Sequence, residues 1–366
     1  MKAVCLSLLL AMPTIAAAQD LCLRHAIDAS GAESGLKGQI VVSALTADGD
    51  RDTRVLSAPG QEKLVGNEGF RIASITKTFV AATVLKLWED GRIDLEAPIT
   101  RWLPASWTQR LAGDGYRPEK MTVRHLLSHT SGLADHAQAK QFIATIKADP
   151  ATEWSRARDI ARLVEWTDPM GTPGEKFAYS DTGYLLLGAI VEEITGQDLP
   201  DAVRAQLGLD RLGLKDTYWE RYEPARGRVR AHQMFEGDDT YAWNPSLDLF
   251  GGGGLVASTA DIAAFFDALL QGRVFSKPAT LQRMLSAEGL PAGSPYRLGL
   301  FDYDLKDAHG IGHSGFWGTL AMRDPVSGRT VAGAVTDIAD YRKLKQLVEG
   351  YVRTSAGPEA AAAGCK

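Results

Sequence analysis

The chain has 366 residues, with 40 lysines and arginines against 45 aspartates and glutamates, and its formal net charge is −5. This mild acidity, without any run of basic residues, argues against a nucleic-acid partner. A chain of this length can bury a large core, and we expect one interlocked unit with two lobes.

The N-terminus has the pattern of a secretory signal peptide. A basic start, Met1-Lys2, precedes an apolar run that ends with small residues at Ala18, just ahead of Gln19. This run is too short to span a bilayer, and no later segment is apolar over sufficient length. We therefore expect residues 1–18 to be removed and the protein to be periplasmic or secreted, without a stable membrane span.

Two cysteines remain after removal of that segment, Cys22 and Cys365, at opposite ends of the chain. In an oxidising compartment this arrangement favours a disulfide that joins the termini. The alternative is a pair of free surface thiols. Residues 356–366 form an Ala-rich tail, which we expect to be frayed unless Cys365 anchors it.

The predicted elements alternate in character along the chain. β-Branched residues at 38–44 and 53–56, separated by Asp48-Gly49-Asp50, predict a strand hairpin. Helical patterns then dominate, at 74–90, 122–127, 151–166, 182–195, 198–207 and 261–271. Strand patterns return at 296–303, 318–323 and 330–335, and a final amphipathic helix is predicted at 341–352.

Strand segments at both ends with helices between them predict an α+β fold. In this fold the N- and C-terminal segments form one antiparallel sheet flanked by helices, and a mostly helical lobe is inserted between them. We expect residues 19–355 to form this single domain, with a site in the cleft between the lobes.

Ser74 and Lys77 stand three residues apart at the start of an apolar helix, so they share one helix face. In the first turn, unpaired backbone N–H groups would stabilise an oxyanion. Among apolar groups the lysine pKa falls, and the neutral amine can take the serine proton. A second copy of the pattern, Ser34 and Lys37, lies in a polar stretch without an apolar stripe, and we interpret it as a surface turn.

Tyr179-Ser180-Asp181 precedes another apolar helix. A tyrosine near an ammonium has a lowered pKa and can shuttle a proton between nucleophile and leaving group. The alternative is that Tyr179 is a core aromatic. In either case Asp181 is expected to cap the helix.

A glycine-rich stretch, His313-Ser314-Gly315-Phe316, enters a strand near the C-terminal end. Glycine there lets a substrate approach the strand edge closely. An N–H group near Phe316 would pair with the N–H of Ser74 to hold an oxyanion. The alternative is a glycine-rich turn with an exposed histidine.

Taken together, the ordered motifs Ser-x-x-Lys, Tyr-Ser-Asp and His-Ser-Gly resemble those of the penicillin-recognising serine hydrolases. The chain is similar from about residue 38 to 350 to their class C branch, which includes class C β-lactamases, D-alanyl-D-alanine carboxypeptidases, D-aminopeptidases and esterases. The resemblance implies Ser74 as nucleophile, Lys77 as its activating partner and Tyr179 as general base and acid. The expected substrate-binding residues are Asp181, His313, Gly315 and Phe316.

Two positions depart from the family pattern. Asp181 stands where the family usually has an asparagine, and an ionised aspartate cannot donate a hydrogen bond to a substrate amide. His313 stands where β-lactamases usually carry a lysine, so a fixed positive charge for a substrate carboxylate is missing. Both departures weaken the β-lactamase interpretation, and the histidine is similar to some carboxypeptidases and esterases of the group.

These observations favour an exported serine hydrolase that forms an acyl-enzyme on amide or ester bonds. The preferred activity is that of a D-alanyl-D-alanine carboxypeptidase or a D-amino-acid peptidase or esterase. The alternatives are a class C-like β-lactamase and a non-catalytic module that binds β-lactams or peptidoglycan. No metal or organic cofactor is required. The pair His125 and His129 has helical spacing, but Leu126 stands where a metalloprotease needs its glutamate.

Overall fold

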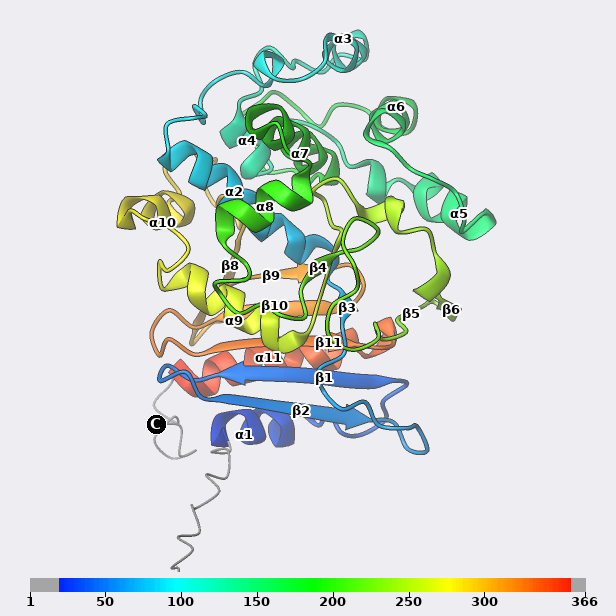
Figure 1. Ribbon diagram of the computed structural model, residues 1–366, viewed down its shortest axis with the longest axis vertical. Helices are drawn as coiled ribbons and strands as arrows, with labels where there is room; N and C mark the ends of the chain where they lie inside the picture. The colour runs from blue at the N-terminus through cyan, green and yellow to red at the C-terminus, as the bar shows by residue number, and fades with distance from the viewer. Residues whose placement is uncertain (1–19, 357–366) are drawn as a thin grey trace, which may run out of the picture.

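The computed structural model describes residues 20–356; residues 1–19, which contain the predicted signal peptide, and 357–366, which contain most of the Ala-rich tail, lie outside this description. The chain is organised around a six-stranded antiparallel sheet with the strand order β2-β1-β11-β10-β9-β8 (Figure 1). Its first strands therefore pair with its last, and Ile40 of β1 lies opposite Val335 of β11. This topology confirms the predicted α+β class. In chain order the strands are β1 (Gln39–Leu45), β2 (Arg51–Ser57), β8 (Phe301–Asp304), β9 (His309–Gly315), β10 (Thr319–Arg323) and β11 (Thr330–Val335).

Two of the C-terminal strands differ from the sequence prediction. The strand predicted at 296–303 is shorter, because the chain turns at Gly299, whose φ is +92°, and β8 begins at Phe301. The glycine-rich segment 309–315 is a full internal strand, β9. Gly312 has to be a glycine there, because an added Cβ would lie 2.0 Å from the Ala321 carbonyl oxygen of the neighbouring strand.

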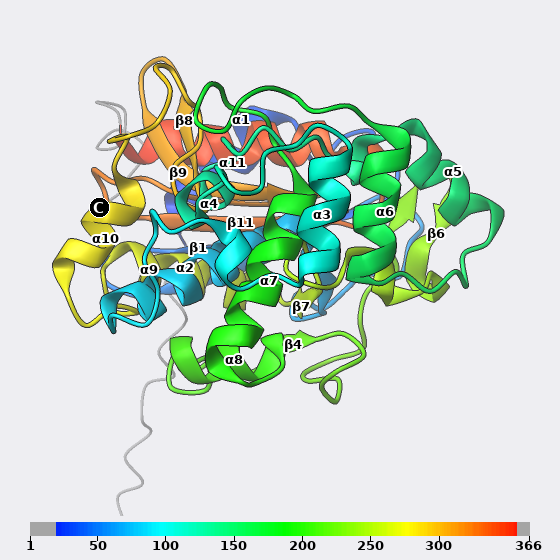
Figure 2. The same cartoon turned by 90° about the horizontal axis from the view of Figure 1, so that it is seen from above.

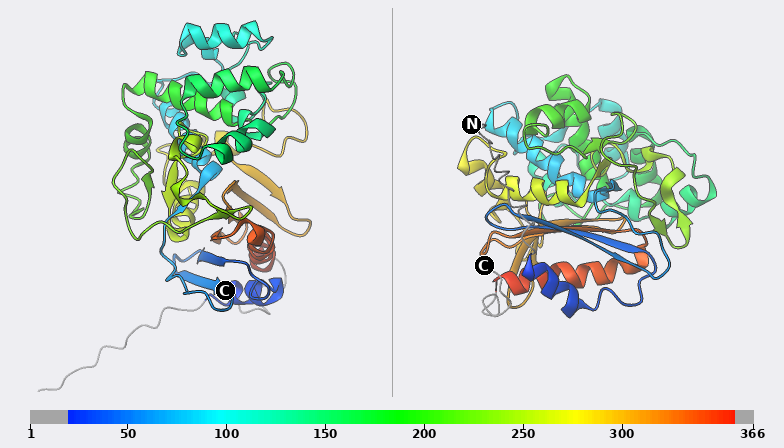
Figure 3. Two further views of the ribbon diagram at one scale, coloured as in Figure 1. Left: turned by 90° about the vertical axis from the view of Figure 1, so that its right-hand side faces the viewer. Right: turned by 60° about the horizontal axis from the view of Figure 1, so that its bottom comes forward.

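Helices cover both faces of the sheet. The helices α1 (Leu21–Ser30) and α11 (Tyr341–Ala356) pack together on one face, and α9 (Thr259–Leu270) covers the other (Figure 3). Helix α1 was not predicted. Its N-cap is Asp20, whose carboxylate accepts bonds from two backbone N–H groups of the first turn and from the Tyr351 hydroxyl at 2.7 Å. These bonds tie the N-terminal helix to the C-terminal one.

Cys22 lies in α1 with no exposed surface, and it is disulfide-bonded. This contradicts the alternative of a free thiol at this position. The proposed partner, Cys365, lies outside the described residues, so the pairing itself stays a prediction.

The inserted lobe is helical and is built around α2 (Thr76–Glu89), which packs against α7 (Asp181–Thr195), α8 (Leu199–Leu207) and α10 (Pro278–Leu285) (Figure 2). Nearly every side chain of α2 is buried. Phe79 of α2 stacks on Phe265 of α9 with ring centroids 3.5 Å apart, which joins the lobe to the sheet side. Each such buried aromatic or aliphatic side chain contributes about 1.5–3 kcal/mol, so α2 is held firmly. The other helices of the lobe are α3 (Ala105–Gly113), α4 (Val123–Leu127), α5 (Lys140–Ala148) and α6 (Arg156–Trp166).

A small three-stranded sheet connects the two parts, in the order β3-β7-β4. Its strands are β3 (Phe70–Arg71), β4 (Tyr218–Trp219) and β7 (Leu255–Ala257), and a separate two-stranded ribbon is formed by β5 (Met234–Phe235) and β6 (Asp238–Asp239). Strand β3 leads directly to Ser74. Between residues 20 and 356, no helix combines the length and the apolar character needed to cross a membrane.

Candidate active site

Ser74 lies in a 3-10 turn, Ala73–Ile75, that leads into α2 at Thr76. The residue before it, Ala73, has a φ of +45°, in the left-handed region that residues other than glycine rarely adopt. The end of β9 packs against this turn. An added Cβ at Gly315 would lie 2.2 Å from the Ile72 carbonyl oxygen, so a glycine is needed here for the strand to approach the nucleophile turn.

Lys77 is fully buried beneath Ser74. Its Nζ donates to Ser74 Oγ at 2.9 Å and to the Gly252 carbonyl oxygen at 2.7 Å, and it forms an ion pair with Asp181. A carboxylate in direct contact stabilises the charged ammonium. The geometry predicted for Ser74 and Lys77 is therefore present, and the lysine also contacts a carboxylate that the sequence analysis did not place beside it.

Asp181 lies in the first turn of α7 and is not its N-cap, so that prediction is wrong. Ser180 caps the helix, because its hydroxyl accepts from the Gly183 N–H at 3.3 Å. The Asp181 side chain is thereby free to reach Lys77. Its carboxylate also benefits from the positive end of the helix dipole.

Tyr179 and Ser74 line the same cavity, and their side chains are close enough to interact. Its ring packs against His129, with centroids 4.1 Å apart, and is parallel to the ring of Phe301. Burial, followed by the negative charge of Asp181, raises the pKa of Tyr179 well above its ordinary value of 10. The prediction of a lowered pKa is wrong, because burial disfavours the charged phenolate and the negative charge of Asp181 adds to this effect.

His313 is buried in β9 and does not line the cavity beside Ser74. Its Nε2 lies 2.9 Å from the Tyr296 hydroxyl, and its Nδ1 lies 2.7 Å from the Ser314 carbonyl oxygen. Burial, aided by the nearby Lys77 charge, lowers the pKa of His313 to about 3, so the ring is neutral at neutral pH. The alternative of an exposed histidine is wrong, and any part that His313 plays in substrate binding is indirect.

A cavity of about 720 Å³ opens over these residues and is lined by Ser74, Tyr179, Asp181, Ser314, Gly315 and Phe316. One wall is aromatic. Phe316 is 48% exposed, and its ring centroid lies 4.9 Å from that of Phe235 and 4.8 Å from that of Trp317. The expected substrate-binding positions Asp181, Gly315 and Phe316 thus meet at one cavity.

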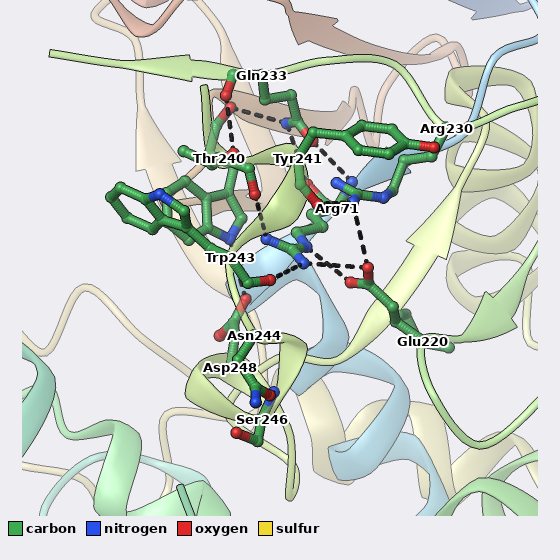
Figure 4. A network of polar contacts seen from close by, with 12 residues as sticks. Arg71, Glu220, Arg230, Gln233, Thr240, Tyr241, Trp243, Asn244, Ser246 and Asp248 are labelled. Atoms are coloured by element: carbon green, nitrogen blue, oxygen red, sulfur yellow. Dashed lines mark hydrogen bonds and ion pairs between the residues drawn. The ribbon is translucent and has the colours of Figure 1, made fainter. Parts of the chain in front are cut away.

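A network around Arg71, three residues before Ser74, fixes the loop that closes the cavity (Figure 4). The buried guanidinium of Arg71 donates to the carboxylate of Glu220 and to the backbone carbonyl oxygens of Thr240 and Trp243. Further along the same loop, Asp248 accepts a bond from the Trp317 indole at 3.2 Å. Because charged hydrogen bonds are the stronger ones, Arg71 ties the nucleophile strand to the cavity wall.

Several further residues belong to the site, and the sequence analysis did not identify the carboxylates among them. The glycine run 251–254 contributes the Gly252 carbonyl that holds Lys77, and an added Cβ at Gly253 would lie 2.2 Å from Asp248 Oδ1. The cavity is also lined by Asp135, Asp159 and Asp248. No local motif marks these carboxylates, because they come from separate segments. The four consecutive glycines at 251–254 were the one available signal, since a tight approach of backbone to a site commonly requires glycine.

An α+β fold of this topology, with a serine hydrogen-bonded to a buried lysine and a tyrosine on the same cavity lining, defines a serine hydrolase of the penicillin-recognising type. The family model described as Beta-lactamase matches residues 32–342. The chain belongs to this family.

The similar proteins include an esterase, a penicillin-binding protein and an amidohydrolase. The chain is 37% identical over 169 residues to esterase EstB of Burkholderia gladioli, covering 44% of this chain and 41% of the esterase. It is 29% identical over 271 residues to penicillin-binding protein 4* of Bacillus subtilis (strain 168), covering 69% and 56% of the two chains. The chain thus spans about half the length of these curated relatives. Among solved structures, a D-stereospecific amidohydrolase from Streptomyces sp. superposes with a TM-score of 0.76 at 27% identity, covering 91% of this chain and 98% of the other.

Proposed function

We propose that this protein is an exported serine hydrolase that cleaves amide or ester bonds through an acyl-enzyme, with D-amino-acid peptides and simple esters as its substrates. The observation that carries the proposal is the hydrogen bond from Lys77 Nζ to Ser74 Oγ, at 2.9 Å, at a cavity that Ser74 and Tyr179 both line. The names of the esterase and amidohydrolase relatives support it. In this proposal residues 1–18 direct export and residues 19–355 form the catalytic domain.

In the proposed reaction Ser74 Oγ attacks the substrate carbonyl and becomes acylated. The Lys77 ammonium donates to Oγ and stabilises the alkoxide as it forms. Tyr179 takes the serine proton in its deprotonated form, which its raised pKa makes the minor form at neutral pH, and returns the proton to the leaving amine or alcohol. Water, deprotonated by the same tyrosine, then releases the acyl group and restores the serine.

The oxyanion of the tetrahedral intermediate would be held by two backbone N–H groups, those of Ser74 and Phe316. The last ladder pair between β9 and β10 is Gly315 with Thr319, so Phe316 stands one residue beyond the paired strand. Its N–H group is then available to a substrate that lies along the strand end. Two preorganised donors of this kind supply the largest single contribution in acyl transfer.

Asp181 is expected to set the pH at which the enzyme becomes active. Because the Asp181 charge helps to raise the Tyr179 pKa, Asp181→Asn leaves the Lys77 charge uncompensated and lowers that pKa. The rise of kcat/KM with pH should then move to lower pH in the variant. The pH dependence of kcat/KM measures this shift. Asp307→Asn, which changes an exposed aspartate that does not line the cavity, is the control. An unmoved or alkaline-shifted profile contradicts the role of Tyr179 as base.

A substrate panel tests the proposal directly. We expect the protein to release product from a short-chain 4-nitrophenyl ester or a D-alanyl-D-alanine peptide, and mass spectrometry of a rapidly quenched sample to find the acyl group on Ser74. Faster turnover of a chromogenic cephalosporin than of either substrate would assign a β-lactamase instead. An acyl adduct without turnover of any substrate would favour the binding module, and neither adduct nor turnover would overturn the proposal.

A further inference from the structure

The cavity beside Ser74 is lined by more acidic than basic side chains. Five carboxylates line it, those of Asp135, Asp159, Asp181, Asp248 and Glu236. The one lysine on its lining, Lys140, is exposed at the rim and makes no ion pair with any acid of the described chain 20–356. Lys77 lies underneath and is already paired with Asp181. Glu236 is paired with Lys147, so the acids of the cavity that form no ion pair with a lysine or arginine of residues 20–356 are Asp135, Asp159 and Asp248.

Asp159 of α6 is the carboxylate that lacks a counterpart. The residue is 4% exposed, and its Oδ1 has no hydrogen-bond partner. The nearest candidate, His136 Nε2, lies 3.9 Å away, beyond hydrogen-bonding distance. Leaving a buried carboxylate without a partner is costly. Because Asp159 lines the cavity, a bound substrate can supply the missing partner.

The arginines that neighbour Asp159 on α6 are engaged elsewhere. Arg156 forms a two-pronged ion pair with Glu192, at 2.6 and 2.9 Å. Arg158 donates to the Glu153 carbonyl oxygen at 2.9 Å, and its guanidinium lies over the Trp154 ring. Neither arginine is placed to neutralise Asp159 by direct contact.

The form of the cavity favours an organic cation over a metal ion. Within the part of the chain that the structure describes, no three histidine, cysteine, aspartate or glutamate side chains are grouped to hold a metal. An ammonium needs fewer acceptors than a metal ion does. The aromatic wall of Phe235, Phe316 and Trp317 offers an apolar surface within the same cavity. The cavity therefore suits a molecule with an ammonium at one side and an apolar group at the other.

We propose that the enzyme selects acyl donors with a free, positively charged amino group, and that Asp159 and Asp135 hold this ammonium while the aromatic wall holds the side chain. The substrate class is amino-acid esters, amides and peptides with an unblocked amino end. This inference rests on the proposed function and refines its substrate. Donors that carry a carboxylate in this part of the cavity are disfavoured, because like charges repel.

The test compares three matched donors: D-phenylalanine 4-nitroanilide, its N-acetyl derivative and 3-phenylpropionic acid 4-nitroanilide. For the first, we expect a kcat/KM at least about 10-fold above those of the two uncharged donors, as for a lost charged contact. Asp159→Asn should reduce this ratio several-fold, whereas Asp307→Asn should leave it unchanged. Equal rates for the three donors, or an unchanged ratio in Asp159→Asn, would overturn the proposal.

A binding measurement on the unmodified enzyme keeps the test independent of how the variant folds. Calorimetry or competition should find 2-phenylethylamine bound more tightly than the uncharged 2-phenylethanol, with a preference that weakens as salt is added. No preference for the amine would overturn the inference even where esters are hydrolysed. Preference for the amine without hydrolysis of any ester or amide would instead leave the amine site standing and overturn the proposed hydrolase.

Discussion

Ser74→Ala is expected to reduce kcat for ester or amide hydrolysis by roughly 10³-fold or more, because removal of a covalent nucleophile leaves the contributions of binding and oxyanion stabilisation alone. The substitution should lower the reaction rate without destabilising the fold. Ser74 is half-buried on a turn, and its partner Lys77 keeps the Gly252 carbonyl oxygen and Asp181 as partners, so the free energy of unfolding should change little. Initial rates and thermal unfolding of the purified variant measure the two effects.

The chain contains a matched control for this experiment. Ser34 begins the second Ser-x-x-Lys pattern, and the structure confirms the predicted surface turn, with Ser34 exposed and its hydroxyl bonded to the Gly31 carbonyl oxygen at 3.0 Å. Ser34→Ala should keep the full rate and the full yield of acyl adduct. Residual activity in Ser74→Ala comparable with that of Ser34→Ala would mean that another residue is the nucleophile.

Tyr179→Phe is expected to lower kcat by about 10²–10⁴-fold, the usual contribution of a positioned general acid and base. The phenylalanine ring can keep the contacts with His129 and Phe301, so the variant loses the hydroxyl that reaches Ser74 and little else. KM should change far less than kcat, because the hydroxyl acts on the nucleophile. Steady-state kinetics with one ester and one amide separate the two parameters.

A control variant and a double variant test whether the loss in Tyr179→Phe comes from its action on Ser74. Tyr222→Phe removes a hydroxyl from an exposed tyrosine and should leave the rate unchanged. The double variant Ser74→Ala/Tyr179→Phe should be no slower than Ser74→Ala alone, because residues that act as a unit have non-additive effects. If the two losses multiply in the double variant, Tyr179 and Ser74 do not act on the same proton.

The sequence predicted those features that depend on neighbours in the chain. The apolar stripe after Ser74 predicted the helix that carries Lys77, since a helix face is fixed by spacing alone. The β-branched segments at both ends predicted the antiparallel sheet. The stretch around His313 was predicted only to enter a strand, and not to form the full strand β9, because its glycines weaken the local signal, although the close approach to β10 and to Ile72 requires them.

The tertiary structure decided the charge state of the site and the character of its cavity. Whether Tyr179 has a raised or a lowered pKa depends on burial and on Asp181, whose reach toward Lys77 follows from Ser180 capping the helix. His313 turns into the core because Tyr296 offers its ring a hydroxyl there. The carboxylates of Asp135, Asp159 and Asp248 meet at one cavity only after three distant segments have packed together. Spacing along a chain fixes which side chains share a helix or strand, but dielectric environment and long-range charge arise only from packing.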